Sequence, residues 1–422
     1  MTAQQIARGG PGQRSNPVLR TPRINLPPAG RTRVAHGLTA AAATGNALVL
    51  QTCKDCAATQ YPPREACGAC LSDRLQWREQ AGGGALVAQT TVRHSNHLYF
   101  RERLPWRVGT IHLDAGPAVV AFLTDSVPAA PARVRVSLHL DRAGEAVLVA
   151  QPESEYAMHG EEKLQRETGC NPKGRNVLVS DGKSAVGQAL VRALVGAGCA
   201  TVWVGHAEPW KKHLALDGIA TLPGVHLVPL DLTDARAVAE LGGELGGKVD
   251  IVVSNAEVNR TQSVASRRGT DVARAEMDIN YFGLLRLAQA FAPALQARAA
   301  DGARHAVAWV NLLSIFALNH YPTHGTYSAS KAAALSIAQG LRAQMLPHGI
   351  RVLNLFPGPV DDEWNQNLPP PKLSPAALAS ATLDALMRGV EDVYPGDVAQ
   401  EWLARWRENP KALEREVAHG SL

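Results

Sequence analysis

The sequence contains no long hydrophobic run. Nowhere among its 422 residues do about 18 apolar residues follow one another, which is the length that a membrane-spanning helix needs. The N-terminus also lacks the charged, then apolar, then small-residue pattern of a secretory signal. We therefore expect a cytoplasmic protein with no membrane partner.

Acidic residues and lysine are missing from the first 35 positions. This segment carries six arginines, namely Arg8, Arg14, Arg20, Arg23, Arg31 and Arg33. The formal net charge of the whole chain is +5, so the remainder is close to neutral. The basic charge thus belongs to a Pro/Gly-rich arm rather than to a folded face that binds nucleic acid. We predict a disordered arm over residues 1–40, either a solvated tail or a docking arm, and no nucleic-acid partner.

Cysteine is scarce, and four of the six cysteines lie in two C-x-x-C pairs separated by ten residues: Cys53, Cys56, Cys67 and Cys70. Without a secretion signal, metal binding is favoured over disulfides for this cluster. Four thiolates complete a tetrahedral shell around Zn²⁺ and leave no open position, which indicates a structural metal. Iron in a rubredoxin-like site and two disulfides are the alternatives.

The remaining pattern divides the chain into further segments. A zinc ribbon over 41–80 is followed by short alternating strands over 81–152, and a polar linker is predicted over 153–175. From residue 176 to 422, short apolar runs alternate with helical patterns. The predicted strands cover 177–180, 201–205, 226–231, 250–256, 305–313 and 351–357, and the predicted helices 186–197, 234–245, 271–299 and 326–346. This alternation indicates an α/β class with a doubly wound parallel sheet, the Rossmann type.

Tyr327 and Lys331 are spaced i, i+4 at the start of the last of these helices. The spacing places the phenol and the ammonium on one helix face. A nearby positive charge stabilises phenolate, so we expect the pKa of Tyr327 to fall below its usual value of about 10. A tyrosine tuned in this way can give or take a proton near neutral pH.

The context of this pair is more specific than the pair itself. Ser314 lies thirteen residues upstream of Tyr327, Asn280 lies in the helix over 271–299, and Phe356-Pro357-Gly358-Pro359-Val360 follows the sixth strand. This order resembles the catalytic tetrad of the short-chain dehydrogenase/reductase family. The resemblance implies that Tyr327 is the general acid/base, that Ser314 holds the substrate oxygen, and that Lys331 contacts the nicotinamide ribose. It also implies that Asn280 anchors a proton-relay water.

The first strand leads into a loop that departs from this family. The family has Thr-Gly-x-x-x-Gly-x-Gly, whose glycines let backbone N–H groups approach a pyrophosphate. Only Gly187 matches in register, since Asp181 replaces the first glycine and Ala185 the second. The Asp181 carboxylate either repels a pyrophosphate or caps the helix, and Lys183 offers a compensating charge.

A second departure follows the fourth strand. The Asn-Ala-Gly of the family is here Asn255-Ala256-Glu257, and we expect the glutamate side chain to narrow the pocket beside the adenine ribose. Asp362 stands where the family often has a threonine that touches the carboxamide. The dinucleotide-binding residues implied by the resemblance are Ser180, Gly182, Lys183, Val186, Gly187, His206, Asp231, Leu232, Asn255, Ala256, Pro357, Gly358 and Val360.

The residues at the end of the second strand indicate which dinucleotide is preferred. NAD preference normally needs an acidic residue there to bind the ribose 2′-hydroxyl. The sequence has Gly205 and His206 instead, with Lys183 nearby, and this favours NADP(H). NAD, and a loss of dinucleotide binding altogether, are the alternatives.

The N-terminal half carries a second resemblance, on Tyr61-Pro62-Pro63-Arg64, Trp77, the glycine run at 82–84 and Pro105-Trp106-Arg107-Val108-Gly109. These features resemble a bacterial family in which a rubredoxin-like zinc ribbon precedes an OB-fold, here placed at 81–152. Members of that family are associated with acyl-CoA enzymes such as thiolases. The resemblance implies a CoA-thioester substrate, a docking role, or both. Residues that would contact CoA phosphates, or simply form the surface of the OB-fold, are Arg93, His94, His97, Tyr99, Arg101, Arg103 and Arg107.

The sequence therefore predicts an oxidoreductase that transfers hydride between NADP(H) and a 3-oxo/3-hydroxyacyl group or another carbonyl or alcohol substrate. The main alternative is a non-catalytic accessory subunit of a thiolase/aldolase or dehydrogenase complex that has lost dinucleotide binding. In a third hypothesis, the tyrosine catalyses a non-redox step such as dehydration. The long helices resemble those that build the oligomers of the family, so a homo- or hetero-oligomer is expected.

Overall fold

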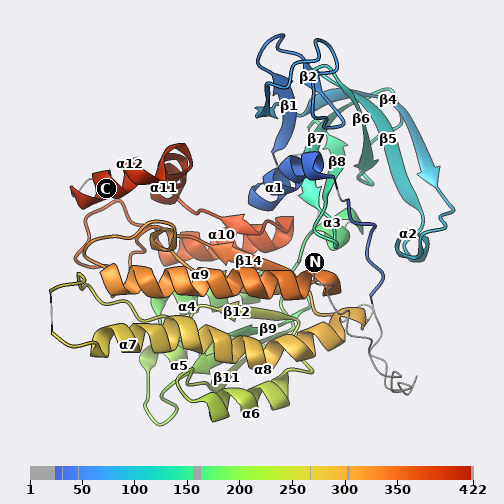
Figure 1. Ribbon diagram of the computed structural model, residues 1–422. Helices are drawn as coiled ribbons and strands as arrows, with labels where there is room; N and C mark the ends of the chain where they lie inside the picture. Colours follow the sequence, from blue (N-terminus) through green and yellow to red (C-terminus); the bar gives the residue numbers. More distant parts are fainter. Residues whose placement is uncertain are drawn as a thin grey trace, which may run out of the picture.

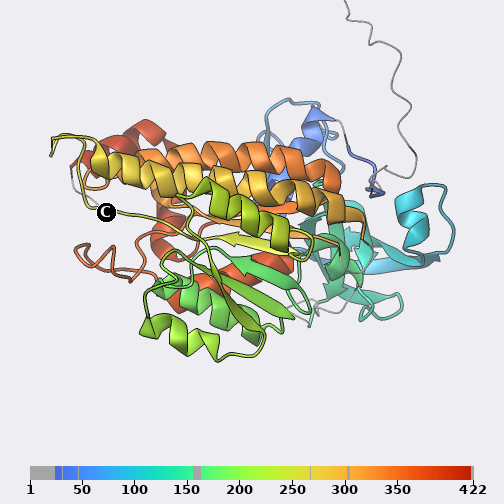
Figure 2. The same ribbon diagram turned by 90° about the horizontal axis from the view of Figure 1, so that it is seen from below.

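The computed structural model describes residues 24–30, 32–45, 47–154, 163–266, 268–301 and 305–419. A small zinc-ribbon sheet and a β-barrel stand at one end of a larger Rossmann-like domain (Figures 1 and 2), as the sequence predicts. Most of the predicted N-terminal arm, residues 1–23 and Arg31, lies outside the described residues. Of the helices in the described part of the chain, none combines the length and the hydropathy needed to cross a membrane.

The ribbon sheet has the order β2-β1-β3, with β1 (Leu48–Cys53) between β2 (Thr59–Gln60) and β3 (Leu75–Gln80). The barrel closes in the order β4-β5-β6-β8-β7, from β4 (Gly83–Val92), β5 (Trp106–Leu113), β6 (Ala118–Leu123), β7 (Ala132–Leu140) and β8 (Ala146–Pro152). The short helix α2 (Leu98–Glu102) lies between β4 and β5. Inside the barrel a Cβ on Gly109 would lie 2.4 Å from Leu86 Cδ1, so glycine is required there for packing.

The last residues of the arm predicted over 1–40 are helical rather than disordered. The 3-10 turn η2 (Arg33–Ala35) leads into α1 (His36–Thr44). Leu38 and Ala42 are spaced i, i+4 and are buried against the barrel core, which stabilises this helix. Within the predicted linker, α3 (Lys163–Thr168) likewise forms and buries Leu164.

The large domain contains a seven-stranded parallel sheet with the order β11-β10-β9-β12-β13-β14-β15. Its strands are β9 (Asn176–Val179), β10 (Thr201–His206), β11 (Val225–Pro229), β12 (Ile251–Ser254), β13 (Ala308–Leu312), β14 (Arg351–Leu355) and β15 (Asp392–Val393). All six predicted strands form. The short β15 was not predicted, because two residues carry no periodic signal.

Helices cover both faces of the sheet (Figure 2). One face packs against α6 (Ala235–Leu245), α8 (Leu284–Ala297), α9 (Gly325–Met345), α11 (Asp397–Glu408) and α12 (Pro410–Ala418). The other packs against α4 (Ala185–Gly196), α5 (Leu214–Ala220) and α10 (Pro375–Arg388). The single helix predicted over 271–299 is α7 (Asp271–Met277), a π-helical segment η3 (Asp278–Gly283) and α8, followed by η4 (Arg298–Ala300). Short 3-10 turns are η6 (Ile315–Ala317) and η7 (Leu346–His348).

Arg351, at the start of β14, joins the barrel to the large domain. Its Nη2 donates to the carbonyl oxygens of Leu140 at 3.2 Å, Asp141 at 3.0 Å and Thr168 at 3.5 Å, and the residue is buried. A backbone bond from Glu391 N to Ala43 O adds a second link. The two domains are therefore coupled by buried polar contacts as well as by chain connectivity.

We expect Arg351→Ala to lower the free energy of unfolding by about 2–4 kcal/mol, because it removes a buried side chain and its hydrogen bonds to carbonyl groups of the barrel and of α3. Denaturant unfolding followed by tryptophan fluorescence measures this change. Arg236→Ala, on an exposed helix face where Arg236 pairs only with Glu240, is the matched control. Equal stability of the two variants would contradict a role for Arg351 in joining the domains.

Candidate functional site

Tyr327 and Lys331 lie on the first two turns of α9, and both are buried. Lys331 Nζ lies 5.5 Å from the centroid of the Tyr327 ring, and a third residue joins the polar ends of the two side chains. One carboxylate oxygen of Glu257 accepts a hydrogen bond from Tyr327 Oη at 3.0 Å and pairs with Lys331 Nζ at 2.7 Å. Lys331 Nζ also donates to Leu312 O, at the end of β13, at 2.9 Å. The structure thus brings the two predicted residues together around an acid.

This arrangement corrects the expected direction of the Tyr327 pKa. Burial, and then the negative charge and hydrogen bond of Glu257, raise the pKa of Tyr327 well above its ordinary value. A hydrogen bond with Ser314 opposes the rise. We had expected Lys331 to lower the pKa, but its charge is paired with Glu257. In this state Tyr327 is held as a protonated phenol.

Ser314 and Asn280 complete the group. Ser314 follows β13, and its Oγ accepts from Phe316 N at 3.2 Å to cap η6. Asn280 lies in the π-helical segment, a local widening of the helix that is frequent at functional sites. Its Nδ2 donates to Val258 O at 2.8 Å and to Ser330 Oγ at 2.8 Å. Asn280 therefore ties the loop that follows Glu257 to helix α9.

Two acids that sequence reasoning assigned to the dinucleotide pocket also lie beside the Tyr327 group, which was not expected. Glu257 was expected to narrow the pocket beside the adenine ribose, but its carboxylate turns toward Tyr327 and Lys331. Asp362 is also buried, and its Oδ1 accepts from Asn365 Nδ2 at 2.9 Å. Burial and the negative charge of Glu257 raise the pKa of Asp362 to about 6. The sequence did offer one signal: a buried lysine such as Lys331 requires a counterion, and Glu257 is an acid in the same predicted pocket.

Asp181 caps the turn that leads into α4. Its Oδ1 accepts from Lys183 N and its Oδ2 from Ser184 N, each at 3.1 Å. Ser184 in turn caps the helix by accepting from Gly187 N at 3.1 Å. Asp181 therefore engages two backbone N–H groups of the loop in which the family binds a pyrophosphate. Of the two expectations for this residue, capping is the one that the geometry matches.

The glycines of this loop are needed for packing. A Cβ on Gly182 would lie 2.1 Å from Val204 Cγ1, and one on Gly187 would lie 2.0 Å from Asp181 O. Lys183 does not pair with Asp181, since its Nζ binds Glu208 at 2.8 Å. The loop keeps a close approach of helix, strand and turn, and the N–H groups of Lys183, Ser184 and Gly187 have side-chain acceptors within it.

A cavity of about 370 Å³ lies next to this loop, at the carboxyl end of the strands. Open α/β sheets bind their ligands at this edge. Seven predicted dinucleotide residues line it: Ser180, Lys183, Val186, Asp231, Leu232, Asn255 and Ala256. Asp181, Glu257 and Asp362 line it as well. The other six predicted residues are not among its lining: Gly182, Gly187, His206, Pro357, Gly358 and Val360.

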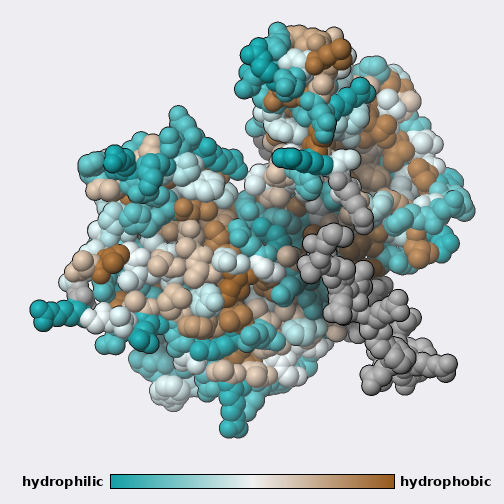
Figure 3. Space-filling view, viewed as in Figure 1, coloured by the Kyte–Doolittle hydropathy of each residue, from teal (hydrophilic) through white to brown (hydrophobic). Residues whose placement is uncertain are grey.

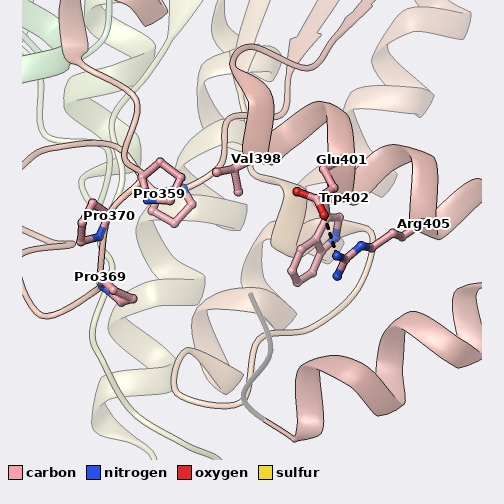
Figure 4. Close-up of a pocket in the computed structure, with 8 residues that line it drawn as sticks. Pro359, Pro369, Pro370, Val398, Glu401, Trp402 and Arg405 are labelled. Carbon is pink, nitrogen blue, oxygen red and sulfur yellow. Dashed lines mark hydrogen bonds and ion pairs between the residues drawn. The ribbon is translucent and has the colours of Figure 1, made fainter.

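A smaller cavity of about 140 Å³ lies between the segment after β14 and helix α11 (Figure 4). Its walls are largely apolar, from Pro359, Pro369, Pro370, Pro371, Val398 and Trp402. Its charged lining residues, Glu401 and Arg405, pair with each other at 2.5 Å. The larger cavity, which adjoins the Tyr327 group, is therefore the candidate active site.

The four clustered cysteines fit a tetrahedral metal. Their sulfurs all lie within 4.8 Å of one another, with 3.6 Å between Cys53 and Cys70 and between Cys56 and Cys67. Four sulfurs about 2.3 Å from Zn²⁺ in a tetrahedron lie about 3.8 Å apart. A distance of 3.6 Å is too long for a disulfide, whose sulfurs lie about 2.05 Å apart. These cysteines are the ligands for structural Zn²⁺.

Three residues considered for CoA contacts have internal roles instead. Tyr99 is buried and its Oη donates to Glu167 at 2.8 Å, while Arg103 pairs with Glu167 at 3.1 Å. Arg107 donates to the carbonyl oxygens of the turn over 124–127. The other four, Arg93, His94, His97 and Arg101, are exposed.

Models of known protein families match three segments of the chain. Residues 175–372 match a family model described as short chain dehydrogenase. Residues 40–76 match the rubredoxin-like zinc ribbon domain of ChsH2, and residues 77–139 match its C-terminal OB-fold domain.

Individual relatives agree with these matches. An uncharacterized oxidoreductase of Staphylococcus haemolyticus is 30% identical over 219 residues, which cover 50% of this chain and 91% of that protein. One of Mycobacterium bovis is 32% identical over 189 residues, covering 42% and 53%, so the chain spans about half the length of that relative. A short-chain dehydrogenase from Burkholderia cenocepacia, solved in complex with NADP, is 34% identical, with a TM-score of 0.53 and coverage of 58% and 98%.

The tetrad on a doubly wound sheet, the four-cysteine ribbon and the closed barrel thus agree with the matches along the chain. The chain belongs to the short-chain dehydrogenase family and carries a ChsH2-type zinc ribbon and OB-fold N-terminal to its dehydrogenase domain.

Proposed function

We propose that this chain is an NADP(H)-dependent oxidoreductase acting on a 3-oxo/3-hydroxyacyl group, with a CoA thioester as the substrate. The observation that carries the proposal is the grouping of Tyr327, Ser314 and Lys331 beside the cavity at the carboxyl end of the sheet. A phenol, a hydroxyl and an ammonium in one buried site form a proton-transfer centre rather than a structural network alone.

NADPH, when bound, supplies the hydride that reduces the carbonyl carbon. Tyr327 gives its phenolic proton to the carbonyl oxygen, so that a ketone becomes an alcohol. The Ser314 hydroxyl donates a hydrogen bond to the oxygen as negative charge develops on it. Lys331 would contact the nicotinamide ribose, and Asn280 holds Val258, which lines the cavity, by a hydrogen bond to its carbonyl oxygen. Tyr327 then regains its proton from solvent.

The preference for NADP(H) is supported by the surroundings of β10. Gly205 and His206 end the strand without an acid. The nearest carboxylate, Glu208, is already paired with Lys183 Nζ at 2.8 Å and with Lys211 Nζ at 3.7 Å. The local charge is therefore suited to a 2′-phosphate rather than a 2′-hydroxyl. The NADP complex of the related Burkholderia cenocepacia structure agrees with this preference.

The acyl-CoA substrate is supported by the ChsH2-type domains and by the residues that the barrel exposes. Arg93, His94, His97 and Arg101 lie on or beside α2, which stands far from the sheet in Figure 1. Basic side chains suit the phosphates of CoA. The same surface suits a partner thiolase/aldolase or second dehydrogenase subunit that delivers the thioester.

Self-association is the second part of the partner proposal. A groove of about 510 Å³ runs between α8 and α9, lined mainly by small and apolar residues together with three glutamines. Apolar residues are also visible on this face in Figure 3. We propose that this face joins copies of the chain, and a sedimentation measurement that finds only monomers would contradict this.

One observation favours the accessory-subunit alternative. Asp181 engages two N–H groups of the loop, and Glu257 engages Lys331, so two contacts that a dinucleotide would use are taken by carboxylates. A chain that never binds a dinucleotide would tolerate both acids. Titration of the purified protein with NADPH and with NADH, followed by nicotinamide fluorescence, separates the alternatives. Saturable NADPH binding supports the oxidoreductase, and no binding of either up to about millimolar concentration refutes it.

We expect Asp181→Gly to strengthen NADPH binding about tenfold, equivalent to ~1.4 kcal/mol, because it frees the N–H groups of Lys183 and Ser184 for the pyrophosphate. The same change removes the cap of the turn that leads into α4, so the free energy of unfolding should fall by about 1 kcal/mol. Asp234→Gly is the matched control, since Asp234 caps α6 by accepting from Arg236 N and Ala237 N. It should lose similar stability without altering NADPH affinity. Weaker binding by Asp181→Gly would show that the carboxylate assists the cofactor.

A further inference from the structure

The Glu257 side chain separates the catalytic pair from the cavity. Tyr327 and Lys331 are 4% and 2% exposed, and neither lines the cavity, whereas Glu257 does. The Glu257 side chain is 16% exposed, and one of its oxygens meets both the phenol and the ammonium. Any ligand that reaches Tyr327 from this cavity therefore meets Glu257 first.

We propose that Glu257 is a further residue of the proton-transfer site, which neutralises Lys331 and holds Tyr327 as a proton donor, so that the site favours carbonyl reduction over alcohol oxidation. This inference rests on the proposed hydride transfer, because it concerns the direction in which that reaction is favoured. Glu257 acts on Tyr327 by accepting its hydrogen bond and by cancelling the charge of the neighbouring lysine.

The electrostatic argument follows from the distances. A carboxylate 2.7 Å from Lys331 Nζ offsets the field that the ammonium would exert on the phenol. The same oxygen lies 3.0 Å from Tyr327 Oη, where it stabilises the neutral phenol by accepting its proton in a hydrogen bond. A phenolate has no proton to donate and would face the negative charge directly. Because the site is buried, solvent and salt screen these effects only weakly.

The groups around Glu257 come from three elements. Tyr327 and Lys331 face it from α9, and Asp362 lies near enough, in the segment after β14, for the charge of Glu257 to raise its pKa to about 6. Above that pH, Asp362 adds a second negative charge and also raises the pKa of Tyr327. Ser314 is the neutral member of the group and acts in the opposite direction. Among the contacts of Glu257 in the described residues, Lys331 is thus the one cation, while Asp362 adds a second acid near Glu257.

A purely structural ion pair is the competing explanation. Lys331 also donates to Leu312 O, and the family has glycine at the position of Glu257, so a carboxylate here is not a general requirement of the fold. If the Glu257–Lys331 pair were only structural, its removal would change the free energy of unfolding and nothing else. A charge that acts on Tyr327 would also move the pH dependence of proton transfer.

The test compares Glu257→Gln, which keeps the size of the side chain, with Glu257→Gly, the residue of the family. Reduction of a 3-oxoacyl-CoA with NADPH and oxidation of the 3-hydroxyacyl-CoA with NADP⁺ are measured across pH. Removing the negative charge lowers the pKa of Tyr327, so the rising limb of oxidation should move to lower pH by at least about one unit. Near neutral pH the ratio of kcat for oxidation to kcat for reduction, each measured at saturating substrates, should then rise by at least about tenfold. Glu240→Gln, an exposed carboxylate paired with Arg236, should change neither.

Ionisation of Tyr327 can also be measured without any cofactor. Ultraviolet absorbance reports tyrosinate, and subtracting the titration of Tyr327→Phe isolates the contribution of this residue. Both Glu257 variants should ionise at lower pH than the wild type, and an unshifted titration in a folded variant overturns the proposal. If the wild type binds no dinucleotide, the proposed function fails, while this titration still decides the role of Glu257. Should Glu257→Gln not fold, Glu257→Gly gives the deciding result.

Discussion

Tyr327→Phe is expected to reduce turnover of a 3-oxoacyl-CoA by at least about 100-fold while leaving NADPH affinity nearly unchanged. The substitution removes only the hydroxyl that donates the proton, and loss of a general acid costs about 10²–10⁴-fold in rate. The ring remains in its buried position on α9, so the cavity keeps its shape. Steady-state rates with NADPH, together with a fluorescence titration of each protein, measure the two effects separately.

Tyr394→Phe provides the matched control for this experiment. Tyr394 is a partly buried tyrosine, stacked on Phe356 with 4.9 Å between the ring centroids, and it is not among the residues that line the cavity. Its loss of a hydroxyl should leave turnover within about twofold of the wild type. If Tyr327→Phe retains turnover, Tyr327 is not the acid and the Glu257 carboxyl or Asp362 becomes the candidate donor.

The second large effect is expected on removal of zinc. A structural Zn²⁺ held by four thiolates contributes about 10–16 kcal/mol in small zinc modules. The double variant Cys53→Ser/Cys67→Ser removes the two buried ligands, so the ribbon should bind no zinc and should unfold. Trp77 of the ribbon, which is 37% exposed and packs on Gly37 of α1, should lose this contact. Metal analysis and limited proteolysis measure these losses.

Cys199→Ser is the control, because Cys199 lies in the dehydrogenase domain away from the cluster. It should keep one zinc per chain. Chelation of zinc from the wild type should reproduce the double variant, while the dehydrogenase domain remains folded because its two apolar clusters are separate from the ribbon. Less than one zinc per chain in the wild type would contradict this site.

Asp181 and Glu257 both occupy positions at which the family contacts its cofactor. Asp181 satisfies N–H groups of the first loop, and Glu257 satisfies the ammonium of Lys331. Both stand where the family has glycine, and both make contacts that a dinucleotide would otherwise make. Both side chains therefore bear on how the site would receive NADP(H), Asp181 at the pyrophosphate loop and Glu257 beside Tyr327 and Lys331.

Much of this protein could be predicted from its sequence. The six main strands, the doubly wound class and the cysteine quartet all follow from local patterns, since apolar runs of strand length, helical periodicity and C-x-x-C turns are set by near neighbours. The spacing of Tyr327 and Lys331 places them on one helix face for the same reason. The ends of elements were less predictable: α1 forms because Leu38 and Ala42 find a barrel wall to pack against.

The tertiary structure alone decided what Tyr327 contacts. Glu257 and Tyr327 are 70 residues apart, and no local pattern indicates that one carboxylate oxygen will meet both the phenol and Lys331. The orientation of a loop side chain depends on which unpaired charge the fold buries nearby, because a buried ammonium without a partner is costly. The sequence by itself thus determined which groups could transfer a proton. The fold determined, through the charge that it buries beside them, the direction in which Tyr327 is poised to transfer it.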